Sequence, residues 1–347
     1  MTTLHIFNAS IILYGRILKR ASLTIKNSKI AAINRPAPKD AVLINAYGSY
    51  LSPGFIDTHI HGRPEEIIKH ETKHGTTSSI IAVSCGRPAP NIKAYRNVLG
   101  VRLEGPYINP TMAGAQNRRF IITSSRAGMP RLVKSFGKEL KMMTLAPELS
   151  GAERLIRFCR KNGVTPSIGH SNASYVEAKR SFDIGIRHAT HLFNAMSGPR
   201  HGTAGAGLAA LFDKRVTVEV IADLKHVHPG LLRLVFAVKD MDKIILITDS
   251  VRAEILSYPK RSRRLNAGYV CGCSHMIDCV KNVVTHCGIS LADAVRMASY
   301  NPARLFGAAG WKGSISSGKD ADLVLFDKNF NVKFTFIGGR MVYQKKD

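Results

Sequence analysis

The stretch Leu51-Ser-Pro-Gly-Phe-Ile-Asp-Thr-His-Ile-His-Gly62 is an apolar run that ends in two histidines one residue apart. If residues 55–61 form a β-strand and its end, the period of two puts His59 and His61 on the same side, roughly 7 Å apart. Two imidazoles placed in this way can share a metal ion. A pair of histidines at a strand end with no ligand role is the competing interpretation, so the rest of the chain must decide.

The length and composition are those of a soluble globular protein. The 347 residues suffice for one barrel-sized domain with a small appendage, or for two ordinary domains. No apolar run reaches the roughly 18 residues that a spanning helix needs, and residues 1–14 have no basic segment ahead of an apolar one. We therefore expect a cytoplasmic protein with no membrane partner.

The chain is strongly basic, with 50 Lys and Arg against 24 Asp and Glu and a net charge of +26. Such a charge favours anionic partners, either a phosphorylated metabolite or nucleic acid. The basic residues are scattered apart from the cluster Lys260-Arg-Ser-Arg-Arg264, and no aromatic interleaving or nucleic-acid motif accompanies them. A solvated basic surface and a small anionic substrate are therefore favoured over nucleic acid.

The cysteines indicate free thiols. Six cysteines are few for this length, which argues against a disulfide framework. Four of them lie between residues 271 and 287, but the C-x-C spacing of Cys271 and Cys273 differs from that of a zinc knuckle. Buried free thiols are expected there in preference to structural zinc.

Strand-like and helix-like runs alternate through residues 51–311, which is typical of a parallel α/β sheet or barrel. Short β-like runs at both ends of the chain predict a small β-domain formed by residues 1–50 and 312–347. The overall prediction is an α/β fold, a (β/α)8 TIM barrel with this small β-domain, in which the helices between the first and third strands are trimmed. The eight barrel strands expected are Phe55–His59, Thr76–Val83, Val98–Glu104, Met142–Ala146, Val164–His170, Arg187–His191, Val216–Ile221 and Ile244–Asp249.

Helix starts are marked between these strands. Ser150-Gly-Ala-Glu153 and Ser174-Tyr-Val-Glu177 both match the capping-box pattern. Pro229 stands where a first helical residue is expected, and Gly163 marks the end of the helix that follows residue 150.

Side chains that can bind a metal stand at most of the predicted strand ends. The carboxyl ends of barrel strands open at one mouth, where barrel active sites are built. One such residue would more often be structural, but six at the same rim are improbable by chance, so the sequence predicts a metal site. They are His59 and His61 on strand one, Glu104 on strand three, His170 on strand five, His191 on strand six and Asp249 on strand eight, with His226 just past strand seven.

Several longer motifs surround these residues. They are Pro53-Gly-Phe-Ile-Asp-Thr-His-Ile-His-Gly62, Leu103-Glu-Gly-Pro-Tyr107, Gly169-His-Ser-Asn172, Thr190-His-Leu-Phe-Asn-Ala-Met196, Ile221-Ala-Asp223, Thr248-Asp249, Asn301-Pro-Ala-Arg-Leu-Phe-Gly307 and Gly318-Lys-Asp-Ala-Asp-Leu-Val324. Together they resemble the amidohydrolase superfamily, and within it the family of N-acetylglucosamine-6-phosphate deacetylases. The resemblance covers nearly the whole chain.

The resemblance implies a metal-dependent hydrolysis of the N-acetyl group. Relatives that hydrolyse cyclic amides use a carboxylated lysine at the end of strand four, but that end reads Leu145-Ala-Pro-Glu148, so Glu104 is the expected carboxylate ligand. By resemblance Glu104, His170 and His191 would hold a divalent metal, zinc by expectation, and the His59/His61 pair would allow a second ion. Asp249 would be the general base.

The resemblance also implies how a phosphorylated amino sugar is bound. His226 would polarise the acetyl carbonyl or bind sugar hydroxyls, and Asn194 with Ala195 would bind the phosphate. Arg200 would join them, in a family where this arginine often comes from a partner subunit, which implies a homodimer. The loop Ser197–Thr203 departs from the family's Arg-Glu-Pro-Gly, and Gln116 replaces a substrate-binding histidine.

These departures leave the sugar more open than the chemistry. N-acetylglucosamine 6-phosphate is the expected substrate, and N-acetylgalactosamine 6-phosphate, another amide or an aminopurine are the alternatives. A binding protein that keeps the fold without activity is a further alternative, against which the complete ligand set argues.

Overall fold

The computed structural model of the chain describes residues 3–123, 128–251, 264–265, 268–269 and 274–345. The strands are β1 (Leu4–Leu13), β2 (Arg16–Lys26), β3 (Lys29–Ile33), β4 (Val42–Asn45), β5 (Tyr50–Pro53), β6 (Phe55–His61), β7 (Thr76–Ser84), β8 (Val98–Glu104), β9 (Leu140–Leu145), β10 (Thr165–Ile168), β11 (His188–Ala189), β12 (Thr217–Ile221), β13 (Ile244–Ile247), β14 (Ser250–Val251), β15 (Arg264–Leu265), β16 (Gly268–Tyr269), β17 (Leu323–Phe326), β18 (Val332–Ile337) and β19 (Arg340–Gln344). The α-helices are α1 (Pro64–Glu71), α2 (Met129–Phe136), α3 (Ala152–Lys161), α4 (Tyr175–Ile184), α5 (Gly205–Phe212), α6 (Pro229–Val238), α7 (Met276–Cys287), α8 (Leu291–Ala298) and α9 (Tyr300–Leu305).

The two ends of the chain share one sheet, as the sequence predicted. Its order is β19-β18-β17-β5-β1-β2-β3, and β4 pairs with β1. The join between the ends is antiparallel, with Leu325 opposite Leu51. Alternate residues such as Ile11, Leu23 and Phe336 are fully buried and form the core of this sheet, so the period of two that suggested strands here also explains their packing.

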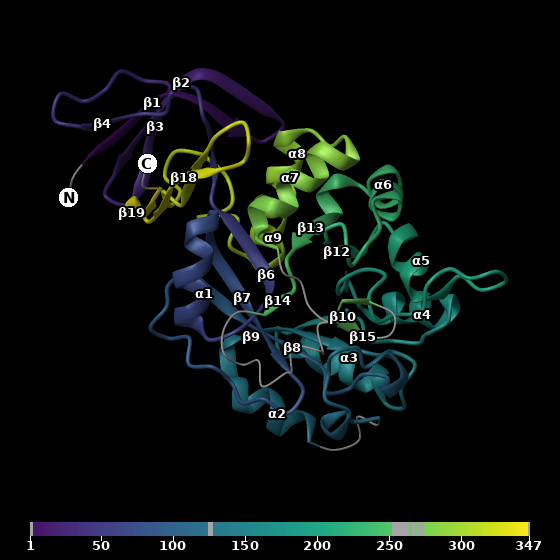
Figure 1. Cartoon of the computed structure of the whole chain (residues 1–347). Coiled ribbons are helices and arrows are strands. Elements are labelled where there is room, and N and C mark those ends of the chain that lie inside the picture. The colour runs from purple at the N-terminus through teal and green to yellow at the C-terminus, as the bar shows by residue number, and fades with distance from the viewer. Residues whose placement is uncertain (1–2, 124–127, 252–263, 266–267, 270–273, 346–347) are drawn as a thin grey trace. The chain divides into compact units, whose positions relative to one another are not determined.

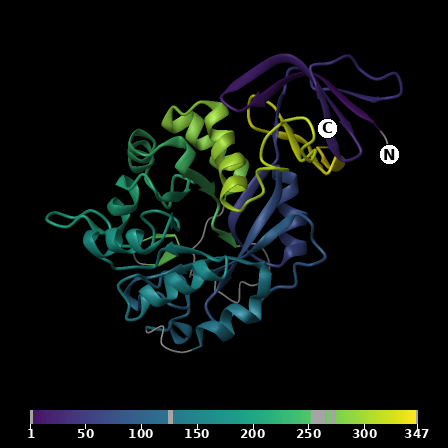
Figure 2. The same cartoon turned by 180° about the vertical axis from the view of Figure 1, so that it is seen from behind.

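The predicted barrel is confirmed by the second sheet, whose order is β13-β12-β11-β10-β9-β8-β7-β6-β14. The pairs β8–β9, β9–β10, β10–β11, β11–β12, β12–β13 and β14–β6 are parallel. The strands at the two ends of this order, β13 and β14, follow one another in the chain, so the sheet closes on itself. Figure 1 and Figure 2 show the strands of the barrel from opposite sides.

The expected trimming of the early barrel helices is also present. A short helix, α1, connects β6 to β7, and residues 85–97 connect β7 to β8 without an α-helix. The chain divides into two compact units. The first contains residues 1–57, 65–79 and 274–347, and the second contains residues 58–64 and 80–273. The second unit contains the six predicted metal-binding residues. In the described part of the chain, no helix has the length and apolar character needed to cross a membrane.

The helix signals fared differently. The capping box at residues 174–177 is confirmed, because Ser174 accepts from the backbone of Glu177 and Glu177 accepts from the backbone of Ser174. Pro229 opens α6 as predicted. The capping box at residues 150–153 is wrong: Gly151, in the left-handed region with φ of 81°, precedes α3, and no side chain caps it. The chain enters α3 through the left-handed conformation of Gly151, which glycine adopts easily, and the expected cap by a serine hydroxyl is not formed.

Two groups of residues named from the sequence lie wholly or partly outside the described residues. Lys260–Arg263 of the basic cluster are outside, as are Cys271 and Cys273. Within the described residues, Cys85, Cys159 and Cys279 are buried and form no disulfide.

A buried ion pair crosses the barrel interior. Arg102 on β8 and Glu219 on β12 are both fully buried, and one guanidinium nitrogen of Arg102 donates to Glu219 and to the carbonyl of Thr58 at 3.2 Å. The second terminal nitrogen of the guanidinium donates to the hydroxyl of Thr190 at 2.9 Å. His188 adds a contact of 3.1 Å to Glu219. Burial opposes ionisation, yet the charge of Arg102 holds the pKa of Glu219 well below its usual range.

Breaking this pair should destabilise the fold strongly. We expect Arg102→Met to lower the free energy of unfolding by about 3–5 kcal/mol, because it leaves the carboxylate of Glu219 buried without its counter-charge. The double variant Arg102→Met/Glu219→Gln should lose less than the sum of the two single variants. Urea unfolding followed by circular dichroism gives these values.

The exposed pair Arg157–Glu153, at 2.8 Å with side chains 65% and 49% exposed, supplies the control. Arg157→Met should cost less than about 1 kcal/mol. Equal losses of unfolding free energy in Arg102→Met and Arg157→Met would contradict the stabilising role assigned to the buried ion pair.

Candidate metal centre and active site

The six predicted metal-binding residues converge at the carboxyl ends of the barrel strands. Two groups have all their ligand atoms within 4.8 Å of one another and could each hold a metal ion. They share Glu104, the last residue of β8. One group is Glu104, His170 and His191, and the other is Glu104, His59, His61 and Asp249.

Three of these residues have a left-handed backbone. The φ angles of His170, His191 and Asp249 are 47°, 30° and 47°, values that non-glycine residues seldom adopt. Each residue lies two positions beyond the end of its strand, β10, β11 or β13. Strained conformations of this kind persist at functional sites when the surrounding contacts hold them, and here they accompany side chains that meet at one point.

Glu104, His170 and His191 have the geometry of metal ligands. Oε1 of Glu104 lies 2.9 Å from Nε2 of each histidine, and the two Nε2 atoms are 3.2 Å apart. Nδ1 of His170 lies 2.8 Å from the carbonyl of Met112, and Nδ1 of His191 lies 3.2 Å from the carbonyl of Asn194. A carbonyl only accepts, so Nδ1 of each ring is the donor to it, and the two Nε2 atoms face one carboxylate oxygen. Glu104, His170 and His191 could hold a metal ion between them.

His59 and His61 approach the same carboxylate from β6. Nε2 of His59 lies 3.5 Å from Oε1 of Glu104 and 3.3 Å from Oδ1 of Asp249. Nε2 of His61 lies 3.4 Å from Oε2 of Glu104 and 3.4 Å from Oδ1 of Asp249. On its other side, Nδ1 of His59 is 3.5 Å from Glu219 of the buried ion pair. The His-x-His pair therefore faces Asp249 as well as Glu104.

The charges in this cluster shift one another's pKa. Burial disfavours a charged imidazole, but Asp249 and Glu104 outweigh burial and raise the pKa of His59 to about 10 and that of His61 to about 8. Burial also disfavours the carboxylates, yet the positive charge of His59 lowers the pKa of Asp249 and lowers that of Glu104 well below its usual range. Burial lowers the pKa of His191. The carboxylates are therefore ionised, and a cation at His59 and His61 must compete with protons.

The residues expected to bind substrate occupy loops of the same unit. Asp223 fixes the ring of His226, whose Nδ1 lies 2.8 Å from Oδ2 of Asp223. Asn194 and Ala195 follow His191 directly, and Ala195 has φ of 47°. Arg200 is exposed and belongs to a small hairpin in which it exchanges two backbone hydrogen bonds with Thr203, 2.8 and 3.0 Å long.

Gln116 has partners that the sequence did not suggest. It is buried, its Oε1 accepts from the backbone N–H of Cys85 at 2.9 Å, and its Nε2 donates to Oε2 of Glu104 at 2.5 Å. Both ends of the amide are thus engaged within the protein.

Sequence reasoning missed other groups that support the ligands. The carbonyls of Met112 and Asn194 carry no signal in the sequence, because their role depends on the path of the backbone. Glu219 could have been noticed as a single carboxylate inside the apolar run Val218-Glu-Val-Ile221. Asp223 was named only as part of a motif, and its contact with His226 gives it a role.

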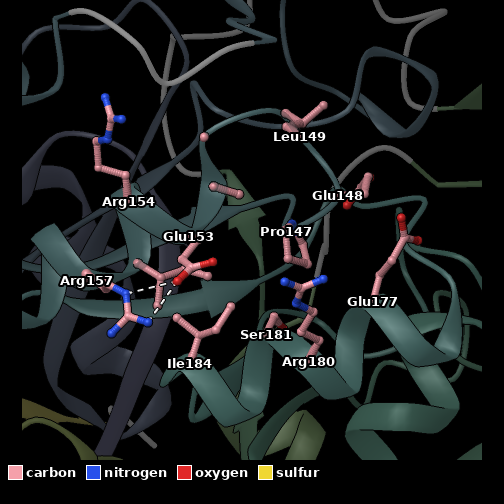
Figure 3. A pocket seen from close by; sticks show the side chains of 13 residues that line it. Pro147, Glu148, Leu149, Glu153, Arg154, Arg157, Glu177, Arg180, Ser181 and Ile184 are labelled. Atoms are coloured by element: carbon pink, nitrogen blue, oxygen red, sulfur yellow. Dashed lines mark hydrogen bonds and ion pairs between the residues drawn. The ribbon is translucent and has the colours of Figure 1, made fainter.

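A groove of about 670 Å³ lies beside α3 and α4, and its lining contains none of the predicted site residues. Figure 3 shows its acidic side chains among Arg154, Arg157 and Arg180. Each carboxylate has a local partner: Glu148 accepts from Ser171 at 2.7 Å, Glu153 pairs with Arg157 and Glu177 caps α4. The groove therefore lacks the convergence of carboxylates and imidazoles found at the barrel mouth.

Comparison with known proteins finds relatives that match almost the whole chain. The family model described as "Amidohydrolase family" matches residues 50–342. The N-acetylgalactosamine-6-phosphate deacetylase of Escherichia coli O157:H7 is 30% identical over 92% of this chain and 94% of its own. The N-acetylglucosamine-6-phosphate deacetylase of Bacillus subtilis is 29% identical over 99% and 98%. A crystal structure of N-acetylglucosamine-6-phosphate deacetylase from Pasteurella multocida superposes with a TM-score of 0.88 at 28% identity, covering 99% of this chain and 100% of that one.

Metal binding at His59 and His61 should release protons and weaken as the pH falls. These rings bind a cation only when neutral, and their raised pKa values, about 10 and about 8, keep them protonated below those values. Each displaced proton should weaken binding by about tenfold per pH unit below the pKa. Calorimetric titration with Zn²⁺ in buffers of different ionisation enthalpy counts the protons.

The double variant His59→Ala/His61→Ala provides the control. It retains Glu104, His170 and His191, and the lowered pKa of His191 predicts a weaker pH dependence for that group. The same number of protons released by the wild type and the variant would contradict the expectation.

Proposed function

Because the chain belongs to the amidohydrolase family, we propose that it hydrolyses the N-acetyl group of N-acetylglucosamine 6-phosphate, giving glucosamine 6-phosphate and acetate. The observation that carries the proposal is the convergence of two imidazoles on one oxygen of Glu104, with Asp249 beside the second pair of histidines. This is the arrangement that hydrolysis of an unreactive amide needs, because it combines cation ligands with an ionised base. The names of the relatives supply the substrate.

We assign the cation as zinc. Nitrogen ligands from histidine together with one or two carboxylates suit Zn²⁺. Glu104, His170 and His191 would hold the main ion, and His59 with His61 would allow a second ion that shares Glu104. When bound, the cation lowers the pKa of a water molecule toward ~7 and stabilises the negative charge that develops on the amide oxygen.

Asp249 is assigned as the general base. Its lowered pKa keeps it ionised at neutral pH, and Oδ1 faces the same space as Nε2 of His59 and His61. It takes a proton from the attacking water and delivers it to the departing amine, which leaves as the neutral amino sugar. A carboxylate that accepts a proton and then passes it on within one cycle needs a pKa below the working pH.

The remaining proposed contacts bind the sugar phosphate. His226, held by Asp223, would donate to the acetyl carbonyl or to a sugar hydroxyl. Asn194 and the backbone of Ala195 would bind the phosphate together with Arg200, whose planar guanidinium matches phosphate oxygens. The net charge of +26 favours the approach of such an anion.

We also propose a cytoplasmic homodimer. Buried free thiols are compatible with a reducing compartment, and the exposed position of Arg200 leaves it able to reach the site of a neighbouring subunit. If it does so, dilution below the dimer's dissociation constant should raise KM for the sugar phosphate.

The zinc-loaded protein should release acetate from N-acetylglucosamine 6-phosphate. Removal of the phosphate should lower kcat/KM by roughly 10- to 100-fold, because a charge-assisted hydrogen bond is worth about 1.5–3 kcal/mol. An enzymatic acetate assay measures both. N-acetylgalactosamine 6-phosphate belongs in the same assay, because the E. coli relative is named for that epimer. Turnover of another amide or of an aminopurine, without acetate from either sugar phosphate at any metal loading, would sink the proposal.

Asp249→Asn should lower kcat by about 10²–10⁴-fold, because the amide cannot accept the proton of the attacking water. The zinc content, measured by elemental analysis, should stay at the wild-type level, which would show that the ligand groups remain intact. Asp183→Asn, at a side chain that is 67% exposed, is the matched control and should leave kcat unchanged. An unchanged rate for Asp249→Asn would remove this residue from the role of base, and loss of zinc would make it a ligand first.

A further inference from the structure

The side chain of Gln116 joins the ends of two neighbouring barrel strands. It is only 6% exposed and lies between Cys85, directly after β7, and Glu104, the last residue of β8. The thiol of Cys85 also donates to the carbonyl oxygen of Glu104 at 3.2 Å. These contacts, with the two amide hydrogen bonds of Gln116, tie the metal ligand Glu104 to its surroundings at both its side chain and its backbone.

The orientation of the Gln116 amide is fixed by its partners. The two ends of an amide have similar shapes, but a backbone N–H can only donate. The atom that faces the N–H of Cys85 must therefore be the oxygen, and the NH2 group must face Glu104. A donor aimed at Oε2 of Glu104 favours the charged carboxylate and holds it in one rotamer, with Oε1 toward His170 and His191.

The same loop also holds His170. The carbonyl of Met112 accepts from Nδ1 of His170, and the backbone N–H of Asn109 donates to the carbonyl of His170 at 2.8 Å. Residues 109–116 thus hold one ligand through the main chain and another through the Gln116 side chain.

We propose that Gln116 is a positioning residue for the metal centre, which fixes the carboxylate of Glu104 in its ligating orientation. The inference rests on the metal centre of the proposed function. A sugar-binding role, which the family resemblance implies for this position, could use only the second N–H group of this buried amide unless the side chain left Cys85 or Glu104. Leaving a buried donor or acceptor without a partner costs about 1–3 kcal/mol, so the observed contacts favour the positioning role.

The test measures metal affinity without any sugar present. Gln116→Met keeps most of the side-chain volume and removes both polar ends, and Gln116→Ala makes the same test without added bulk if the first variant does not fold. We expect the dissociation constant for Zn²⁺, measured by competition with a chromophoric chelator, to rise by about 10- to 100-fold. With zinc at saturation, KM for the sugar phosphate should change by less than about threefold.

Asn117→Ala is the matched control in the same loop. Asn117 is exposed, and its side chain accepts only a local backbone hydrogen bond from Arg119, so this variant should bind Zn²⁺ as the wild type does. An unchanged dissociation constant in the Gln116 variants, with or without a raised KM, would overturn the inference. Weaker zinc binding by protein that releases no acetate from any sugar phosphate would support the positioning role while refuting the proposed activity.

Discussion

The carboxylate of Glu104 is the group on which the site depends. Its Oε1 faces the Nε2 atoms of His170 and His191, and its Oε2 receives a hydrogen bond from Gln116 and lies 3.4 Å from His61. A carboxylate that is 4% exposed remains charged only if positive charge or donors surround it. A ring that donates its only N–H group elsewhere presents a lone pair to this carboxylate and does not stabilise it. Protons or cations must therefore occupy the centre, which links proton binding to metal binding there.

A second group of buried charges lies in the barrel next to the cluster around Glu104. Glu219 neutralises Arg102 in the interior and lies 3.5 Å from Nδ1 of His59. His59 therefore has a carboxylate on each side of its ring, Glu219 at one nitrogen and Glu104 with Asp249 at the other. A fully buried imidazole between such neighbours has little freedom to rotate. The fold thus holds the candidate ligands in place through buried charges.

The barrel, and the convergence of the six candidate metal-binding side chains at one end of it, could be predicted from the sequence, because both depend on local patterns. Apolar runs punctuated by glycine, proline and asparagine mark the strands, and the parallel arrangement brings their carboxyl ends together. The supporting contacts could not be predicted, because they depend on the path of the loops: the carbonyl of Met112 and the amide of Gln116 become partners only when residues 109–116 turn back over the strand ends. The left-handed backbone of His170 and His191 was equally hidden, since neither is a glycine.

The positioning role of Gln116 bears on which residues could distinguish one sugar epimer from the other. Relatives of similar identity are named for the glucosamine and the galactosamine phosphates, which differ only in the orientation of one hydroxyl group. The oxygen of this buried amide is engaged by Cys85 and one of its N–H groups by Glu104, which leaves its second N–H group as the donor that could reach a sugar hydroxyl. Groups around the metal act on the acetyl amide that both sugars share, so they cannot distinguish the two. In the proposed reaction, discrimination would fall to residues outside the metal centre, such as those of the loop 197–203, where this chain departs from the family motif.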